Sequence, residues 1–234
     1  MTFTGFPAVV FDWFEGIIEN NNKEWFEANR ATFENEVKAP MVALFDEAQA
    51  KYGGNIKLAR PNRDVRFSPN KMPYKQNLFA VLHSRPGLKP GEMTSAGLYA
   101  SLDAFGLYGG TGYYDMSADQ LKRYREAIDD GRKAAKLREA VDQASMTLDV
   151  RGRSLKTAPK GYSRDHPHIE LLRMKEIFAG RQFDREEARS AGVRDDLFRA
   201  WDAAAKLIDW LDTHVGPSEL PPEERVARRP RRSA

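Results

Sequence analysis

The sequence contains no cysteine among its 234 residues. This absence excludes a disulfide-stapled scaffold, a thiolate metal cluster and a cysteine nucleophile. No apolar run approaches the roughly 18 residues that a membrane-spanning helix needs, so we expect no membrane partner. The N-terminal apolar run contains Asp12 and no basic residues precede it, which is not the pattern of a secretory signal. Together these absences favour a cytoplasmic protein.

The sequence also lacks the common catalytic and cofactor-binding motifs. We find no Walker lysine motif, no G-x-S-x-G and no H-E-x-x-H. The glycines at positions 106, 109, 110 and 112 lack the spacing of a dinucleotide fingerprint, but glycines in a strand-like run favour a bulge, a turn or close approach of a ligand. His166 and His168 have no convincing carboxylate or thiolate partner. We therefore expect no metal and no cofactor.

The net charge of +3 is a small remainder of larger local charges. Residues 57–75 hold six basic side chains against one acidic, and residues 151–175 hold seven against two. Each segment therefore carries +5, and the body of the chain outside these segments and the arginine-rich C-terminus is acidic. This distribution predicts local anion sites and disfavours a broad footprint on a polyanionic duplex.

Hydrophobic periodicity predicts an α+β fold. Apolar residues recur at helical spacing over 6–18 and 193–215, with a capping box at Ser117 and Gln120 and a predicted N-cap at Asn21. Residues 78–83 and 98–104 carry strand patterns between these helices. We expect a central antiparallel or mixed sheet flanked by N- and C-terminal helices, in one domain over 1–216. Residues 217–234, rich in arginine and proline, are predicted to be a disordered tail.

The first basic segment offers an anion clamp. In an extended chain Asp64 and Arg66 face the same side, so Asp64 can hold a guanidinium that grips a phosphate or carboxylate. Tyr74 could stack on a ring or take part in proton transfer. The predicted ligand-binding residues of this segment are Arg63, Asp64, Arg66, Ser68, Lys71, Tyr74 and Lys75. A solvated basic hairpin whose Arg–Asp pair only holds the loop is the alternative interpretation.

The second basic segment adds Lys156, Arg173 and Lys175 as predicted ligand-binding residues. Pro167 predicts the first turn of a helix, which His166 or Asp165 would cap. Because imidazole titrates near neutral pH, His166 is a candidate for general acid–base chemistry, together with Tyr74 and Asp64. A purely structural cap is an equally good interpretation of His166.

These two segments carry a resemblance to a known family. RDVRFS-x-x-K-x-PYK is present over residues 63–75, and LK-x-x-P-x-G-Y followed by DHP and L-R-x-K over residues 155–175. With NNKEWFEANR at 21–30, they resemble the domain-of-unknown-function (DUF) family 2461 of bacteria and fungi, from about Phe6 to Trp210. Pro69-Asn70 departs from the more charged pair expected there. The resemblance implies no particular activity, but it marks both segments as family motifs.

Three functional hypotheses follow. In the leading one, the two basic segments converge on one pocket for a phosphorylated or carboxylated small molecule, and catalysis or binding alone is left open. In the second, the basic segments and the tail bind nucleic acid. In the third, the motifs are structural in a scaffold or partner-binding protein.

Overall fold

A six-stranded antiparallel sheet forms the centre of the protein. The structure is a computed structural model that describes residues 2–66, 68–87, 94–221 and 224. The strand order is β1-β2-β3-β4-β6-β5, and every pairing is antiparallel. The strands are β1 (Asn55–Leu58), β2 (Asn77–His83), β3 (Leu98–Asp103), β4 (Gly106–Tyr113), β5 (Asp149–Arg151) and β6 (Ile177–Phe183). The α+β prediction is confirmed.

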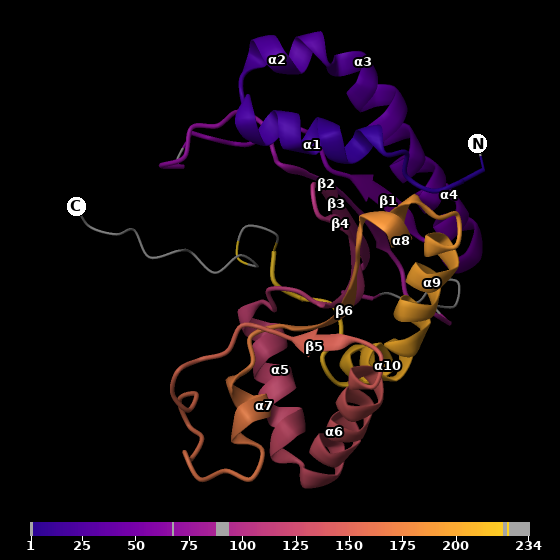
Figure 1. The fold of residues 1–234 in the computed structure, drawn as a ribbon. Coiled ribbons are helices and arrows are strands. Elements are labelled where there is room, and N and C mark those ends of the chain that lie inside the picture. Colours follow the sequence, from indigo (N-terminus) through magenta and orange to yellow (C-terminus); the bar gives the residue numbers. More distant parts are fainter. Residues whose placement is uncertain (1, 67, 88–93, 222–223, 225–234) are drawn as a thin grey trace.

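Helices precede, interrupt and follow the strands along the chain (Figure 1). The first group is α1 (Val9–Glu19), α2 (Lys23–Ala28), α3 (Arg30–Thr32), the π-helix η1 (Phe33–Lys38) and α4 (Ala39–Tyr52). The second group is α5 (Ala118–Asp129), α6 (Gly131–Ser145) and α7 (Ile169–Arg173), and the third is α8 (Arg185–Arg189), α9 (Val193–Ala203) and α10 (Ala205–His214). None of the helices in the described ranges combines the length and apolar character needed to cross a bilayer.

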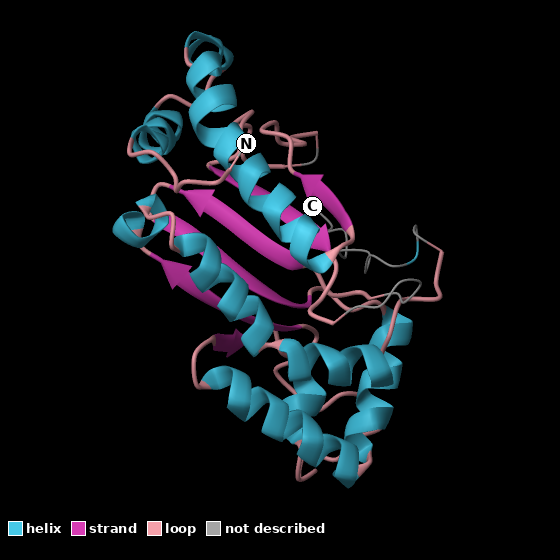
Figure 2. Cartoon of the chain, turned by 90° about the vertical axis from the view of Figure 1, so that its right-hand side faces the viewer, coloured by secondary structure: helices cyan, strands magenta, loops and turns pink. Residues whose placement is uncertain are grey.

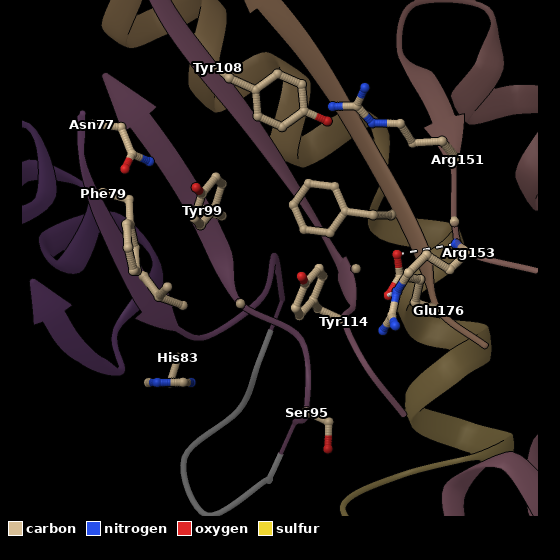
Figure 3. Close-up of a pocket in the computed structure, with 15 residues that line it drawn as sticks. Asn77, Phe79, His83, Ser95, Tyr99, Tyr108, Tyr114, Arg151, Arg153 and Glu176 are labelled. Carbon is tan, nitrogen blue, oxygen red and sulfur yellow. Dashed lines mark hydrogen bonds and ion pairs between the residues drawn. The ribbon is translucent and has the colours of Figure 1, made fainter. Parts of the chain in front are cut away.

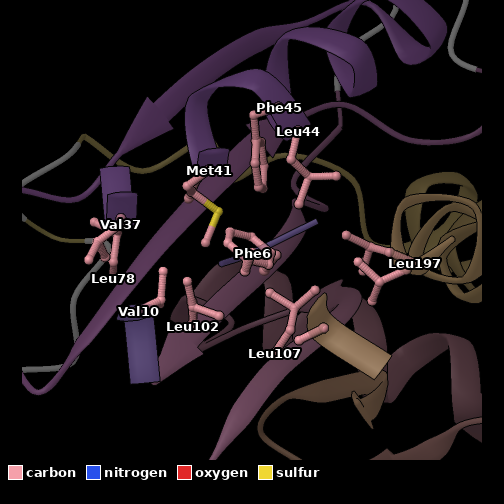
Figure 4. Packing of buried hydrophobic residues seen from close by; sticks show 14 of the residues in the cluster. Phe6, Val10, Val37, Met41, Leu44, Phe45, Leu78, Leu102, Leu107 and Leu197 are labelled. Atoms are coloured by element: carbon pink, nitrogen blue, oxygen red, sulfur yellow. The ribbon is translucent and has the colours of Figure 1, made fainter. Parts of the chain in front are cut away.

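Helices of the first and third groups cover one face of the sheet (Figure 2). Leu78, Ala80 and Leu82 of β2 point to this face and are buried, as the alternation of a strand requires. Helix α4 packs on β1 and β2, whereas α8, α9 and α10 pack on β4. Figure 4 shows this core, in which side chains from α1, η1 and α4 meet the sheet and Leu197 of α9. We call the opposite face of the sheet, which carries Phe79 of β2 and Tyr99 of β3, the open face.

A second hydrophobic cluster lies at the other end of the molecule. It joins buried residues of α5, α6, α7 and α10 to the Tyr113 end of β4 and the Ile177 end of β6. Tyr124 of α5 is fully buried there, and its ring contacts Trp210 of α10 edge-on with centroids 6.1 Å apart. This cluster positions the segment that leads from β5 to β6.

Several local predictions need correction. The N-cap of α2 is Asn22, whose side chain accepts a hydrogen bond from the Trp25 N–H at 2.9 Å. The glycine run at 106–112, for which a bulge, a turn or the close approach of a ligand was expected, forms the central strand β4. The single helix predicted over 193–215 is two helices, α9 and α10, which meet at Ala204. The capping box of α5 is confirmed.

Asp119 of α5 holds the beginning of the C-terminal segment. Its carboxylate accepts hydrogen bonds from Ser117 Oγ at 2.6 Å, Ser218 Oγ at 2.8 Å and the Glu219 N–H at 2.8 Å, and Arg123 pairs with it at 3.1 Å. Residues 217–219, the beginning of the predicted tail, therefore contact α5. The arginine-rich part of that tail, at 225–234, lies outside the described residues.

We expect Asp119→Asn to lower the free energy of unfolding by about 1 to 3 kcal/mol at pH 7. Burial alone would raise the pKa of Asp119, but the hydrogen bonds it accepts outweigh burial and hold this pKa below its usual range. A depressed carboxyl pKa stabilises the fold above the unfolded-state pKa of about 3.9, and this contribution disappears as the pH falls. Urea unfolding from pH 7 to pH 3 should show the deficit of the variant shrinking below about pH 4. Asp142→Asn, on the exposed side of α6, controls for the loss of one charge; a deficit that does not change with pH would contradict the prediction.

Candidate functional site

The first basic segment is a loop between β1 and β2 that its own side chains hold together. Arg66 pairs with Asp64 at 2.7 Å, with both side chains largely exposed, and this contact lowers the pKa of Asp64 to about 2. Arg63 donates to the Met72 carbonyl at 3.3 Å, and Lys71 Nζ donates to the Val65 carbonyl at 3.0 Å. The arrangement matches the alternative interpretation, in which polar side chains fasten the loop.

Lys75 and Ser68 also have contacts within this loop. Lys75 Nζ donates to the carbonyls of Asn62, at 2.9 Å, and Arg60. Burial lowers the pKa of Lys75, and its Nζ lies 6.0 Å from the centre of the Phe79 ring on β2. The Ser68 N–H donates to the Val65 carbonyl at 3.3 Å. The contact with Phe79 places Lys75 beside the open face of the sheet.

Tyr74 belongs to the hydrophobic core. It is 5% exposed, and its ring stacks on Phe26 with centroids 4.1 Å apart and planes 6° from parallel. The Asn21 side chain accepts from the Tyr74 N–H at 3.0 Å and donates to its carbonyl at 3.2 Å. These contacts join two parts of the family motif, 21–30 and 63–75. Tyr74 is therefore placed as a packing residue, not as a ring-stacking or proton-transfer group in a pocket.

His166 packs against the end of α5. Its Nε2 lies 3.3 Å from Asp129 Oδ1, and its Nδ1 accepts from the His168 N–H at 3.0 Å. These two contacts fix the neutral ring as the tautomer with hydrogen on Nε2. With its side chain 15% exposed, His166 organises the turn before α7. No cluster of three metal-ligating side chains occurs in the described ranges.

Of the remaining predicted residues of the second segment, two make hydrogen bonds that hold the segment together and one is exposed to solvent. Arg173 Nε donates to the Leu155 carbonyl at 2.6 Å, and its Nη1 pairs with the exposed Glu170 at 3.2 Å. The Lys175 N–H donates to the Arg153 carbonyl at 2.8 Å. Lys156 is exposed.

The two basic segments do not converge. The first connects β1 to β2 at one edge of the sheet, and the second connects β5 to β6 at the other edge. The strand registers also place them at opposite ends of the strands, because the chain enters β2 at the end where β6 finishes. Figure 1 shows the first segment at the upper left and the second at the lower left. The expectation of one small pocket lined by both segments is therefore corrected.

The open face of the sheet contains a cavity of about 870 Å³ (Figure 3). This volume lies in the range of small-molecule sites. Its walls come from β2, the chain before β3, β3, β4, β5 and β6. The lining includes five aromatic side chains, Phe79, Tyr99, Tyr108, Tyr114 and Phe178, with Asn77, His83 and Ser95 at its edges and Arg151, Arg153 and Glu176 along one side.

Two glycines let aromatic rings lie flat on the floor of this cavity. A Cβ on Gly180 would stand 2.3 Å from Tyr108 Oη, and a Cβ on Gly110 would stand 2.6 Å from a carbon of the Phe178 ring. Gly110 and Gly180 face each other in the register of β4 and β6, so each ring crosses diagonally onto the glycine of the neighbouring strand. The Tyr108 and Phe178 rings are stacked 22° from parallel, with centroids 6.2 Å apart.

An ion network forms the charged side of the cavity. Glu176, with a side chain 10% exposed, accepts from Arg153 Nε at 2.7 Å and from the Arg153 N–H at 3.1 Å. Arg153 also pairs with Asp115, which has a φ of +53°, a sparsely populated conformation for a residue other than glycine. A Cβ on Gly152 would come within 1.9 Å of the Glu176 carbonyl oxygen, so only glycine permits this approach. The network fixes Arg153 in place.

Arg151 is held less firmly than Arg153. Its guanidinium carbon lies 4.8 Å from the centre of the Tyr108 ring, and Nη1 is 3.5 Å from Asp149 in a pair whose side chains are both more than half exposed. In Figure 3 the Tyr108 hydroxyl points toward Arg151. Burial raises the pKa of Tyr108, so the hydroxyl stays protonated and can donate a hydrogen bond.

Sequence reasoning missed most of these residues because they are single positions on separate elements. The available signals were the glycine run with Tyr108 inside it and the alternation that puts Tyr99 on the face opposite the core. Arg151 and Arg153 were counted in the second basic segment but were not assigned a role.

The fold and the cavity define a class: an α+β protein with a ligand-sized, aromatic-floored cavity on the open face of an antiparallel sheet. The chain belongs to the family described as "Conserved hypothetical protein (DUF2461)", which matches residues 9–210. The resemblance carried by the two motifs is thus confirmed. No curated protein matches the chain.

Proposed function

We propose that the protein binds a small phosphorylated or carboxylated molecule that carries a flat ring, in the cavity on the open face of the sheet. The observation that carries the proposal is the Tyr108–Phe178 pair, which lies flat on Gly180 and Gly110 beside the guanidinium of Arg151. Rings that lie flat on a sheet present their outer faces to the cavity, and a planar ligand stacks on such faces.

Arg151 supplies the charge for the anionic group. An exposed ion pair such as that with Asp149 contributes about 1 kcal/mol or less, so its exchange for a ligand costs little. A guanidinium binds phosphate or carboxylate through two parallel hydrogen bonds, which are stronger than neutral ones. Arg153 already pairs with Glu176 and Asp115, so it lines the cavity beside Arg151 without binding the anionic group.

The test compares ligands that differ only in the ring or only in the charge. In a thermal-shift screen, phenyl phosphate and benzoate should raise the melting temperature more than ethyl phosphate, acetate or phenol, because a native-state ligand stabilises the fold. Equal shifts with and without the ring, or no shift with any ring-bearing anion, would contradict the proposal.

Arg151→Gln should weaken the binding of phenyl phosphate by at least tenfold in calorimetric titrations. The variant loses a charge-assisted contact of about 1.5 to 3 kcal/mol. Arg181→Gln is the matched control, because Arg181 lies on β6, pairs with Glu187 and does not line the cavity. An equal loss of affinity in both variants would show that general charge, not the site, accounts for binding.

A further inference from the structure

The two basic segments border the same face of the sheet at diagonally opposite corners. In Figure 1 both extend to the left of the sheet, away from α9. The strand β2 is seven residues long, and β6 lies three strand spacings away from β2. These two lengths are the sides of a rectangle whose diagonal joins the two corners. At about 3.4 Å per residue and about 4.8 Å per strand, the corners are about 25 Å apart. The aromatic cavity lies between them.

We propose that the flat ring and the anionic group bound in the cavity are a base and a phosphate of single-stranded nucleic acid, which crosses the open face from one basic segment to the other. This inference rests on the proposed function and names the class of ligand. A small molecule of drug size does not contact two cationic segments about 25 Å apart, whereas single strands occupy about 4 to 16 nucleotides on one binding fold and can span that distance.

The cavity has the chemistry that such a strand needs at its centre. Proteins that bind single strands combine a basic track for the backbone with aromatic side chains on which successive bases stack. Here Tyr99 contacts both members of the flat pair, with centroids 6.4 Å from Tyr108 and 6.1 Å from Phe178, and Phe79 lies 5.8 Å from Tyr99. These rings form a continuous series from β2 to β6.

The same observations disfavour a duplex. Bases paired in a duplex keep their faces stacked on one another, so they cannot lie on protein rings. The charge outside the two segments and the arginine-rich C-terminus is acidic and would repel a duplex that covered more than the open face. The inference is therefore specific for single strands.

The length of the ligand supplies the first test. Fluorescence anisotropy of labelled oligothymidylates in about 50 mM salt should show at least tenfold tighter binding of an eight-nucleotide strand than of a dinucleotide, with little further gain at twelve nucleotides. With four to seven phosphate contacts, the logarithm of affinity should fall against the logarithm of salt concentration with a slope of about −3 to −5. A twelve-base-pair duplex should bind at least tenfold more weakly than the eight-nucleotide strand.

Variants of each segment supply the second test. Arg60→Gln with Arg66→Gln, and separately Lys156→Gln with Lys160→Gln, should each reduce the magnitude of the salt slope by about 1.4, which is the loss of two contacts on a single strand. All four side chains are exposed. Tyr99→Leu should weaken binding of the eight-nucleotide strand by about tenfold through the loss of stacking.

The control is Lys136→Gln with Arg138→Gln, two exposed positions of α6 outside the open face, and it should leave both affinity and slope unchanged. Equal affinity for the dinucleotide and the longer strand, a flat salt dependence or equal binding of the duplex would each overturn this inference. If phenyl phosphate binds while strand length has no effect, only this inference fails. If neither phenyl phosphate nor any oligonucleotide binds, the proposed function fails with it.

Discussion

Replacing Asp212 with alanine is expected to lower the free energy of unfolding by about 3 to 5 kcal/mol, because it removes the buried carboxylate from its ion pair with Arg85 and from the hydrogen bonds that it accepts. Asp212 Oδ2 lies 2.6 Å from Arg85 Nε, and the side chains are 10% and 15% exposed. The same carboxylate accepts hydrogen bonds from Thr94 Oγ1 at 2.9 Å and from the Tyr113 hydroxyl. Guanidinium chloride unfolding at pH 7 measures the change.

Asp209→Ala is the matched control for this prediction. Asp209 pairs with the same arginine at 2.6 Å, but its side chain is 58% exposed. Solvent screens such a pair, so its loss should cost about 1 kcal/mol or less. Similar losses for Asp209→Ala and Asp212→Ala would show that burial does not determine the strength of these contacts, and the prediction would be wrong.

The cluster around Asp212 also determines where the cavity ends. It joins α10 to the segment between β2 and β3 and to the last residue of β4, Tyr113. Tyr114 and Ser95, which follow directly on two of its members, line the cavity. Burial raises the pKa of Tyr113, which keeps its hydroxyl protonated as a donor to Asp212. Loss of Asp212 should therefore loosen the Tyr114 end of the open face as well as the fold.

Periodic segments of the sequence were sufficient to predict the fold class. The stripe over 6–18 became α1, the alternation over 98–104 became β3, and the capping box at Ser117 began α5. These predictions succeeded because each element buries one face, so its pattern is written in consecutive residues.

The central strand β4 could not be predicted in the same way. Its sequence, GLYGGTGY, has glycines where side chains would show the alternation. The reason for these glycines follows only from the pairing of β4 with β6. In this pairing Gly110 faces Gly180, and each glycine lies beneath a ring from the neighbouring strand. Information of this kind lies in pairs of residues about 70 positions apart, which no single-segment pattern contains.

The residues predicted for the site differ from those that line the cavity for a related reason. Composition identified charged side chains but not their hydrogen-bond partners. Lys71 and Arg173 bond backbone carbonyls of their own segments, and Tyr74 stacks within the core. The polar motifs therefore identified segments rich in charged side chains. The cavity is lined mainly by residues on separate strands, which no motif connects. The charge of the two segments remains relevant only if a ligand is long enough to reach both.

The second large effect is expected for Gly180→Val, which should lower the free energy of unfolding by about 1 to 3 kcal/mol and abolish binding of ring-bearing anions. A Cβ at this position would stand 2.3 Å from Tyr108 Oη and 2.8 Å from the Gly109 carbonyl oxygen. The ring can move, but only into the cavity, and the backbone of β4 cannot move without breaking its pairing with β6. Valine favours strands, so propensity alone would predict a gain in stability.

Gly131→Ala separates this effect from the general consequences of replacing glycine. Gly131 begins α6, and a Cβ there would meet no atom within 4 Å. Alanine at such a site reduces the entropy of the unfolded chain, so we expect an increase in stability of about 0.4 to 1 kcal/mol and unchanged binding. Chemical unfolding and titration with phenyl phosphate should be measured on both variants. Full binding by Gly180→Val would show that ligands do not use the face of the Tyr108 ring, because the substitution displaces that ring before it changes any other part of the cavity.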